Sequence, residues 1–254
     1  MKKNKKIGPP NKLHTLFEGA IAGRDRFHSL LSLKTLKKSL PKGDKHPVLL
    51  FPGFLASDKS MQPLCNLLNQ LNYTAETWQG GINWGPSDER LEHTRKRLKQ
   101  IYDENGGQKV SLIGWSLGGI YVRELAREYP DMVRSVITLG TPFHAVHNPD
   151  STVVGSLFSY VNPDIEPESI FDPNLPIIPP ITSIYTKKDG IAHWKTCLLK
   201  ADKKTENIEV DTSHMGLVVN LNVFKIIANR LAQPQGQWKN MYKARKKIRK
   251  PYKK

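Results

Sequence analysis

From residue 47 onward, the chain alternates short apolar runs with longer amphipathic stretches. A short apolar run closed by Gly, Pro or Asn is typical of a buried strand, and apolar residues three or four apart are typical of a helix with one buried face. Repeated in this order, the two patterns predict an α/β fold with a mostly parallel, twisted sheet and helices on both faces. The predicted strands are 46–51, 73–78, 109–114, 133–139, 181–186 and 206–210, and the predicted helices are 58–71, 87–102, 117–129 and 218–231.

One segment breaks this alternation. Residues 144–180 hold seven prolines around an apolar patch between Val153 and Val161. We expect the segment to leave the sheet as a short cap-like insertion within one domain over 47–238. The patch is equally compatible with a local helix that packs on the sheet.

Length and composition limit the class of protein. With 254 residues, 38% of them apolar, the chain can bury one large core. Its apolar runs are shorter than the roughly 20 residues of a bilayer-crossing helix, and residues 7–10 do not continue the basic start as a secretory signal would. Cys65 and Cys197 lie far apart without ligand spacing, so neither a disulfide framework nor a zinc site is predicted. We therefore expect a cytoplasmic protein.

The net charge of +16 is concentrated at the two ends of the chain. Residues 1–46, a basic N-terminal lead segment, carry 12 Lys/Arg and 3 Asp/Glu. Residues 239–254, a basic C-terminal tail, carry nine Lys/Arg and no acidic residue. The intervening domain is nearly neutral, which favours attachment to an anionic partner outside the functional site over a basic nucleic-acid groove within the fold.

The segment Gly114-Trp-Ser-Leu-Gly118 fits the pattern G-x-S-x-G. A serine nucleophile on a sharp strand-to-helix turn needs glycine on both sides, because the backbone there is strained and neighbouring Cβ atoms would collide. A predicted strand precedes Ser116 and a predicted helix follows it. This context favours a nucleophile over a simple glycine-rich turn.

A serine hydroxyl needs a base and an acid that orients the base. On a sheet of this kind, the acid and then the base follow later strands. Asp189 follows 181–186 and His214 follows 206–210, so both are the predicted partners of Ser116. His193 is the competing base, and the other candidate acids are Asp164, Asp172 and Asp211.

Acyl-transfer chemistry also requires two N–H donors for the developing oxyanion. We predict that they come from Leu117, directly after the nucleophile, and from Phe54, in the turn after the first predicted strand. Pro52-Gly53 is equally compatible with a plain turn. His144 and His147 form an H-x-x-H pair without a third ligand, so no metal site is predicted there.

Several segments together resemble lipase- and esterase-like members of the α/β-hydrolase superfamily, and most of all a bacterial group of hydrolases. The resemblance extends over about residues 47–232. The segments that carry it are 48–56, 114–119 with 123–126, 137–142, 189–190 and 213–214. The resemblance implies an acyl-enzyme on Ser116, His214 as base and then acid, Asp189 as its orienter, and no cofactor. Two departures stand out: many lipases have His-Gly where this chain has Pro52-Gly53, and His where it has Trp115. We expect Trp115 to stack or pack.

The leading hypothesis is a serine hydrolase that cleaves a carboxylic ester with an apolar acyl group. An acyltransferase with the same acyl-enzyme, or a non-catalytic basic binding protein on a hydrolase frame, are the alternatives. The tail mixes its Lys/Arg with four apolar or aromatic residues, which predicts peripheral attachment to an anionic membrane surface, such as the inner membrane face. A solvated tail and contact with nucleic acid are the other interpretations.

Overall fold

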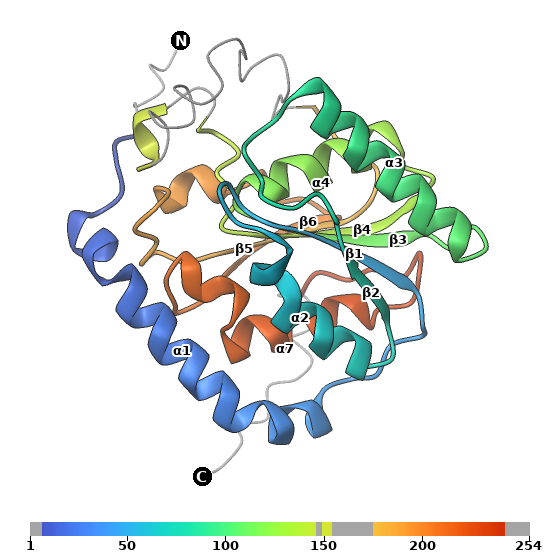
Figure 1. The fold of residues 1–254 in the computed structure, drawn as a ribbon, viewed down its shortest axis with the longest axis horizontal. Helices are drawn as coiled ribbons and strands as arrows, with labels where there is room; N and C mark the ends of the chain where they lie inside the picture. Colours follow the sequence, from blue (N-terminus) through green and yellow to red (C-terminus); the bar gives the residue numbers. More distant parts are fainter. Residues whose placement is uncertain (1–6, 146–148, 154–174, 242–254) are drawn as a thin grey trace.

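The computed structural model describes residues 7–145, 149–153 and 175–241. Its centre is a six-stranded, wholly parallel sheet in the order β2-β1-β3-β4-β5-β6 (Figure 1). The strands are β1 (Pro47–Phe51), β2 (Thr74–Thr77), β3 (Val110–Trp115), β4 (Val133–Leu139), β5 (Ile181–Tyr185) and β6 (Thr205–Glu209). All six predicted strands are therefore confirmed, and so is the α/β architecture.

Helices cover both faces of the sheet. In Figure 1, α3 (Asp88–Glu104) and α4 (Leu117–Glu128) lie on one face, and α1 (Lys12–Ser39), α2 (Asp58–Gln70) and α7 (Leu221–Leu231) lie on the other. The central strands are buried along almost their whole length, as expected for a parallel sheet covered on both sides.

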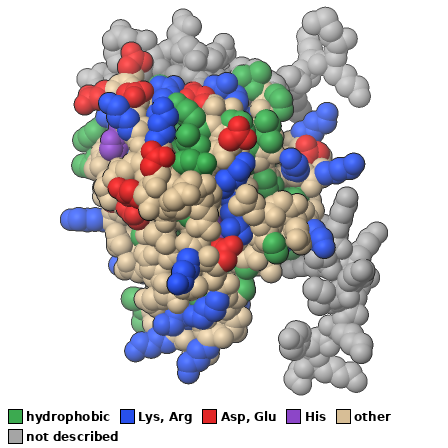
Figure 2. Space-filling view, turned by 90° about the vertical axis from the view of Figure 1, so that its right-hand side faces the viewer, with side chains coloured by type: hydrophobic (Ala, Val, Ile, Leu, Met, Phe, Trp, Pro, Cys, Tyr) green, Lys and Arg blue, Asp and Glu red, His purple; other side chains and the backbone are tan. Residues whose placement is uncertain are grey.

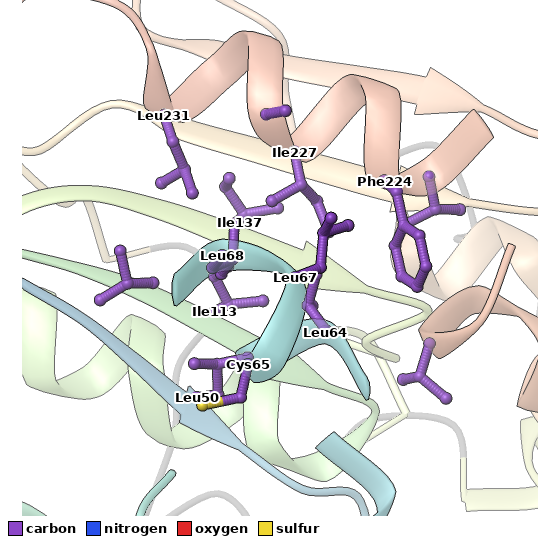
Figure 3. Close-up of a cluster of buried hydrophobic side chains, with 14 of the residues drawn as sticks. Leu50, Leu64, Cys65, Leu67, Leu68, Ile113, Ile137, Phe224, Ile227 and Leu231 are labelled. Atoms are coloured by element: carbon purple, nitrogen blue, oxygen red, sulfur yellow. The ribbon is translucent and has the colours of Figure 1, made fainter. Parts of the chain in front are cut away.

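Two apolar clusters fix these layers. Figure 3 shows one of them, where Leu64, Leu67 and Leu68 of α2 meet Phe224 and Ile227 of α7 above the sheet. The other cluster joins the opposite face of the sheet to α3 and α4 through buried side chains that include Leu98, Ile101, Val122 and Leu125. The two clusters hold the carboxyl ends of the strands in register, and these ends position the candidate site.

The helix α1 was not predicted from the sequence. It lies along the outside of the molecule and contacts α7 and the short helix η3 (Met215–Val218) (Figure 1). A second difference concerns the last predicted helix, 218–231. It begins at residue 221, because the side chain of Asn220 accepts hydrogen bonds from the N–H groups of Asn222 and Val223 and so caps α7.

Only parts of the two segments predicted outside the sheet are described. In 144–180, a short helix η1 (Pro149–Ser151) and a bridge between Thr152 and Ala192 join the segment to the turn after β5. Most of the predicted apolar patch and of the basic tail lie outside the described residues. The described start of the tail is attached to the domain: the N–H of Met241 donates to Glu206, and the carbonyl of Lys239 accepts from Arg230.

Candidate active site

Ser116 occupies a strained turn between β3 and α4. Its backbone angles are φ 53° and ψ −121°, a left-handed conformation that is rare for a residue with a side chain. A Cβ atom added at Gly118 would lie 2.5 Å from the carbonyl oxygen of Phe51, and one at Gly114 would collide with the backbone of Gly118 and Gly119. The glycines predicted around the serine are thus required by close backbone packing. The turn leaves Ser116 half-buried and open to a ligand.

Asp189 lies in the turn after β5 with its carboxylate held on both oxygens. Oδ1 accepts hydrogen bonds from the N–H groups of Ile191, at 3.0 Å, and Ala192, at 2.7 Å. Oδ2 lies 2.6 Å from Nδ1 of His214. The side chain is buried, so these three contacts replace its hydration and fix its direction.

His214 follows β6 and is buried beside this carboxylate. Burial by itself lowers the pKa of the imidazole, but the negative charge and hydrogen bond of Asp189, with a further contribution from Glu18, raise it above its ordinary value. A carboxylate at Nδ1 leaves Nε2 as the nitrogen that can take up a proton from a nucleophile. His214 is therefore arranged as a base with an orienting acid.

The sheet brings Ser116 to the same edge as this pair. The N–H of Ser116 donates to the carbonyl of Leu139, and a Cβ added at the next residue, Gly140, would lie 3.0 Å from Nδ1 of His214. Between these two described residues, Ser116 and His214, the structure contains no hydrogen bond. Catalytic hydrogen bonds are often long or poorly aligned without substrate and tighten when it binds. Of the three predicted residues, the structure thus joins Asp189 and His214 by a hydrogen bond and places Ser116 at the same edge of the sheet.

Trp115 contacts both the backbone and the imidazole ring of His214. Its indole Nε1 donates to the carbonyl of His214 at 3.2 Å, and the two ring centroids lie 5.8 Å apart. The ring also packs against the apolar cluster of Figure 3. Trp115, the residue before the serine in the pattern G-x-S-x-G, therefore packs as expected, and it also links the turn of Ser116 to the backbone of His214.

The predicted oxyanion donors lie on either side of Ser116. Leu117 is the first residue of α4, and Phe54 lies in the turn directly after β1. A Cβ added at Gly53 would lie 3.2 Å from the Cβ of Ser116, so this turn contacts the nucleophile. Both N–H groups thus belong to segments that touch Ser116.

A buried residue that the sequence did not indicate holds this turn. The side-chain Nδ2 of Asn83 donates to the carbonyl of Pro52, and its Oδ1 accepts from the hydroxyl of Tyr121. Its backbone exchanges hydrogen bonds with Leu55 and Ala56. Asn83 therefore ties both ends of the turn to α4. A single Asn in a loop gives no signal of such a role in a sequence.

Glu18 of α1 is a second residue that the sequence did not indicate. Its carboxylate is buried and accepts hydrogen bonds from the N–H groups of Gly190, His214 and Met215 at 2.7, 3.0 and 3.1 Å. One turn away, the hydroxyl of Thr15 donates to the carbonyl of Gly190 at 2.6 Å. The helix α1 therefore joins the turn of the acid to the turn of the base. The sequence signal for Glu18 is weak, since it is one of three acidic residues in the basic segment 1–46.

The alternative base and the described alternative acid make other contacts. His193 stacks on Trp194 and accepts a hydrogen bond from the N–H of Lys195 through Nδ1, and burial with the nearby Lys195 lowers its pKa. Asp211 is exposed and pairs with Lys188. Asp164 and Asp172 lie outside the described residues.

The H-x-x-H pair lies in the segment that follows β4. Nε2 of His144 interacts with the carbonyl of Leu198 at 3.1 Å, and His147 is not among the described residues. Within 7–145, 149–153 and 175–241, no group of three or more His, Cys, Asp or Glu side chains is placed to hold a metal ion.

Comparison with known proteins identifies the fold. A family model described as the alpha/beta hydrolase fold matches residues 46–169, which include the nucleophile turn. The solved structure of alpha/beta hydrolase domain-containing protein 10 from mouse superposes with a TM-score of 0.53 over 74% of this chain and 90% of that one, at 18% identity. The chain has the α/β-hydrolase fold.

Its curated relatives are distant and partial. Serine hydrolase BPHL of Mus musculus is 30% identical over 104 residues, or 38% of this chain and 36% of that protein. A triacylglycerol lipase of Pseudarthrobacter phenanthrenivorans is 31% identical over 106 residues, or 39% of this chain and 33% of that protein. The match thus spans about a third of the length of these relatives. Among α/β-hydrolase-fold proteins, this chain is similar to lipases and serine hydrolases.

Proposed function

We propose that the protein is a serine hydrolase that cleaves a carboxylic ester through an acyl-enzyme on Ser116. The observation that carries the proposal is the buried His214–Asp189 hydrogen bond of 2.6 Å at the sheet edge where Ser116 is held in a left-handed turn. A buried carboxylate that orients an imidazole next to a strained serine is the arrangement of a nucleophile, a base and an orienting acid.

The reaction follows from the roles of these groups. The Oγ atom of Ser116 attacks the ester carbonyl carbon while its proton passes to Nε2 of His214, and Asp189 stabilises the imidazolium. The N–H groups of Leu117 and Phe54 bind the oxyanion. Collapse of this intermediate breaks the carbon–oxygen bond, and His214 gives its proton to the departing alcohol. Water, activated by His214, then releases the acid in a second round of the same steps, and no cofactor is required.

The proposed substrate is an ester with an apolar acyl group. Names of similar proteins support this class, since they include triacylglycerol lipases and, at a TM-score of 0.50 and 16% identity, a monoacylglycerol lipase of Paleococcus ferrophilus. The apolar residues expected in the cap-like segment 144–180 supply a second argument from the sequence. We place the protein in the cytoplasm, with its basic tail at an anionic membrane surface.

The decisive experiment is labelling with a fluorophosphonate probe beside a chain-length series of aryl esters. We expect labelling of the wild-type protein, none of Ser116→Ala, and turnover that rises with acyl length. Labelling that survives in Ser116→Ala would contradict the assignment of the nucleophile. A faster release of acyl product in the presence of an added alcohol would instead identify an acyltransferase.

A further inference from the structure

The helix α1 faces the protein with its polar side. Glu18, Asp25 and Ser29 are its buried residues along the first five turns, and all three are polar. Glu18 holds the catalytic turns, and Oδ2 of Asp25 accepts from Thr212 and Asn220 at 2.5 and 2.8 Å. This half of the helix is therefore attached to the domain by hydrogen bonds, whereas a surface helix usually packs through an apolar stripe.

Most of the large apolar side chains of α1 are exposed, whereas Leu33 and Leu36 near its end pack on the core. Six large ones are exposed by half or more of their surface: Leu13 62%, Leu16 74%, Phe17 52%, Phe27 60%, Leu30 72% and Leu31 67%. At 3.6 residues per turn they fall within an arc of roughly 140°, opposite the buried residues. Scattered exposed leucines are ordinary in proteins, but two groups of large apolar side chains exposed on the same side of one helix, within 13–17 and 27–31, indicate an interaction surface. We name these six residues the outer face of α1.

The exposed charged residues of α1 are all positive. The six basic residues of α1 are at least partly exposed, while both of its acidic residues, Glu18 and Asp25, are buried and hydrogen-bonded. By contrast, Asp and Glu side chains stand among Lys and Arg on the opposite side of the molecule, which Figure 2 shows. The basic residues of α1 are Lys12, Arg24, Arg26, Lys34, Lys37 and Lys38.

We infer that the outer face of α1 inserts into the surface of an anionic lipid bilayer. Exposed apolar side chains flanked by Lys and Arg are the features of a helix that lies in the membrane interface, with its apolar face in the acyl boundary and its basic residues at anionic headgroups. A second copy of this chain fits less well, because two outer faces in contact would bring twelve basic residues together in a protein of charge +16.

The same helix would then place the candidate site at the lipid surface. Thr15 and Glu18 contact the turns of Asp189 and His214 directly, and a hollow of about 410 Å³ lined by Pro9, Leu16 and Val153 lies beside this end of α1. Val153 in turn is hydrogen-bonded to Ile191 next to the catalytic acid. This inference deepens the proposed function, since it names a membrane ester as the source of substrate, but lipid binding is measured without any turnover.

The first test localises the contact in the full-length protein. Cys65 and Cys197 are buried, so an environment-sensitive nitrobenzoxadiazole label can be directed to a cysteine introduced by Leu30→Cys, with Ile178→Cys as the matched control on another surface. Vesicles of phosphatidylcholine with phosphatidylglycerol should shift the emission of the label at position 30 to the blue, and leave that at position 178 unchanged. No shift at position 30 would overturn the inference.

The second test removes the apolar face. Leu30→Gln/Leu31→Gln keeps good helix formers in α1, and Leu175→Gln/Ile178→Gln removes two apolar side chains elsewhere. We expect the α1 pair to weaken partitioning into the anionic vesicles by on the order of tenfold or more, and the control pair to leave it unchanged. The α1 pair should hydrolyse a soluble short-chain ester as the wild type does, so a failure of the proposed function would be seen separately. A wild-type dimer that the α1 pair converts to a monomer would identify a second copy as the partner and overturn the inference.

Discussion

Ser116, Asp189 and His214 come from three different strand ends and meet only because the sheet is parallel. The left-handed backbone at Ser116 costs on the order of 1–3 kcal/mol, which the packing of the surrounding glycines and strands must offset. The orientation of His214 depends on Asp189 at one nitrogen and on Trp115 at its carbonyl. At this scale the proposed chemistry depends on a few short contacts, which single substitutions can remove.

The three residues of the proposed triad should act as one unit. Ser116→Ala and His214→Ala are each expected to lower kcat by on the order of 10⁴ or more, and the double variant should lose little beyond either one. Asp189→Asn should be milder. Single-turnover kinetics on an aryl ester measure these effects, with His193→Ala as the control. Loss of turnover in His193→Ala, together with its retention in His214→Ala, would contradict the assignment of the base.

The raised pKa of His214 gives a prediction for the pH profile. The base works in its neutral form, so kcat/KM should fall as pH drops through a value above the ordinary 6.5 of the imidazole. Glu18→Gln removes a negative charge that favours the imidazolium, and it should therefore move this acidic limb to lower pH. Glu89→Gln, on the exposed start of α3, is the matched control. An unchanged limb in Glu18→Gln would show that Glu18 does not act on His214 through its charge.

At the scale of elements, the turn after β1 and the helix α1 position the site from opposite sides. The turn after β1 is held by Asn83, which is hydrogen-bonded to Tyr121 of α4. The helix α1 contacts the turns of Asp189 and His214 through Glu18. Neither element contributes a reacting atom. Each fixes backbone N–H groups or side chains whose displacement by about 1 Å can cost on the order of a hundredfold in rate.

Asn83 offers a test of the oxyanion turn. Asn83→Ala removes the hydrogen bond to Pro52 and leaves the backbone contacts with Leu55 and Ala56. We expect kcat to fall by on the order of tenfold with little change in KM, because the N–H of Phe54 then binds the oxyanion less well. Tyr121→Phe, which removes only the outer hydrogen bond of the network, should have a smaller effect. A rise in KM at constant kcat would place Asn83 in substrate binding instead.

The strands of the sheet could be predicted from the sequence, whereas the helix α1 could not. Strands such as 47–51 and 110–115 were predictable because burial on both faces makes them continuous apolar runs. The order of Ser116, Asp189 and His214 was predictable because each follows a strand. The helix α1 was not, since basic residues such as Lys34 share the side of its exposed apolar residues and Leu36 lies on the buried side, which removes the usual amphipathic signal. Glu18 was missed for the same reason, and the role of Phe54 stays a prediction.

On the scale of the whole molecule, a nearly neutral domain carries basic segments at both ends of its sequence. The described helices include none that is long and apolar enough to span a bilayer. Attachment to a membrane surface would therefore depend on the outer face of α1 and on the charge of the tail. These contributions differ physically, because salt screens charge within about 8–10 Å but leaves apolar burial intact.

Removal of the tail should separate the two contributions. The structure shows where to cut, since Lys239 and Met241 are hydrogen-bonded to Arg230 and Glu206, so the truncated chain should end at residue 241. We expect this chain to hydrolyse a soluble ester at the wild-type rate, and its sedimentation with anionic vesicles to lose most of its dependence on salt. Equal salt dependence of the full-length and truncated proteins would exclude the tail from membrane attachment.

The contacts of Glu18 also bear on how the protein is made. Its hydrogen-bond partners lie 172 and 196 positions later in the chain, at Gly190 and His214. At ribosomal speeds of 5–20 residues per second, α1 waits roughly 10 to 40 s before those partners leave the ribosome. During this interval the helix has neither the hydrogen-bond partners of Glu18 nor the complete sheet beside it. The proposed active site is therefore completed only after the segment that follows β6 has left the ribosome, and a nascent chain that stalls before residue 214 carries Ser116 without His214.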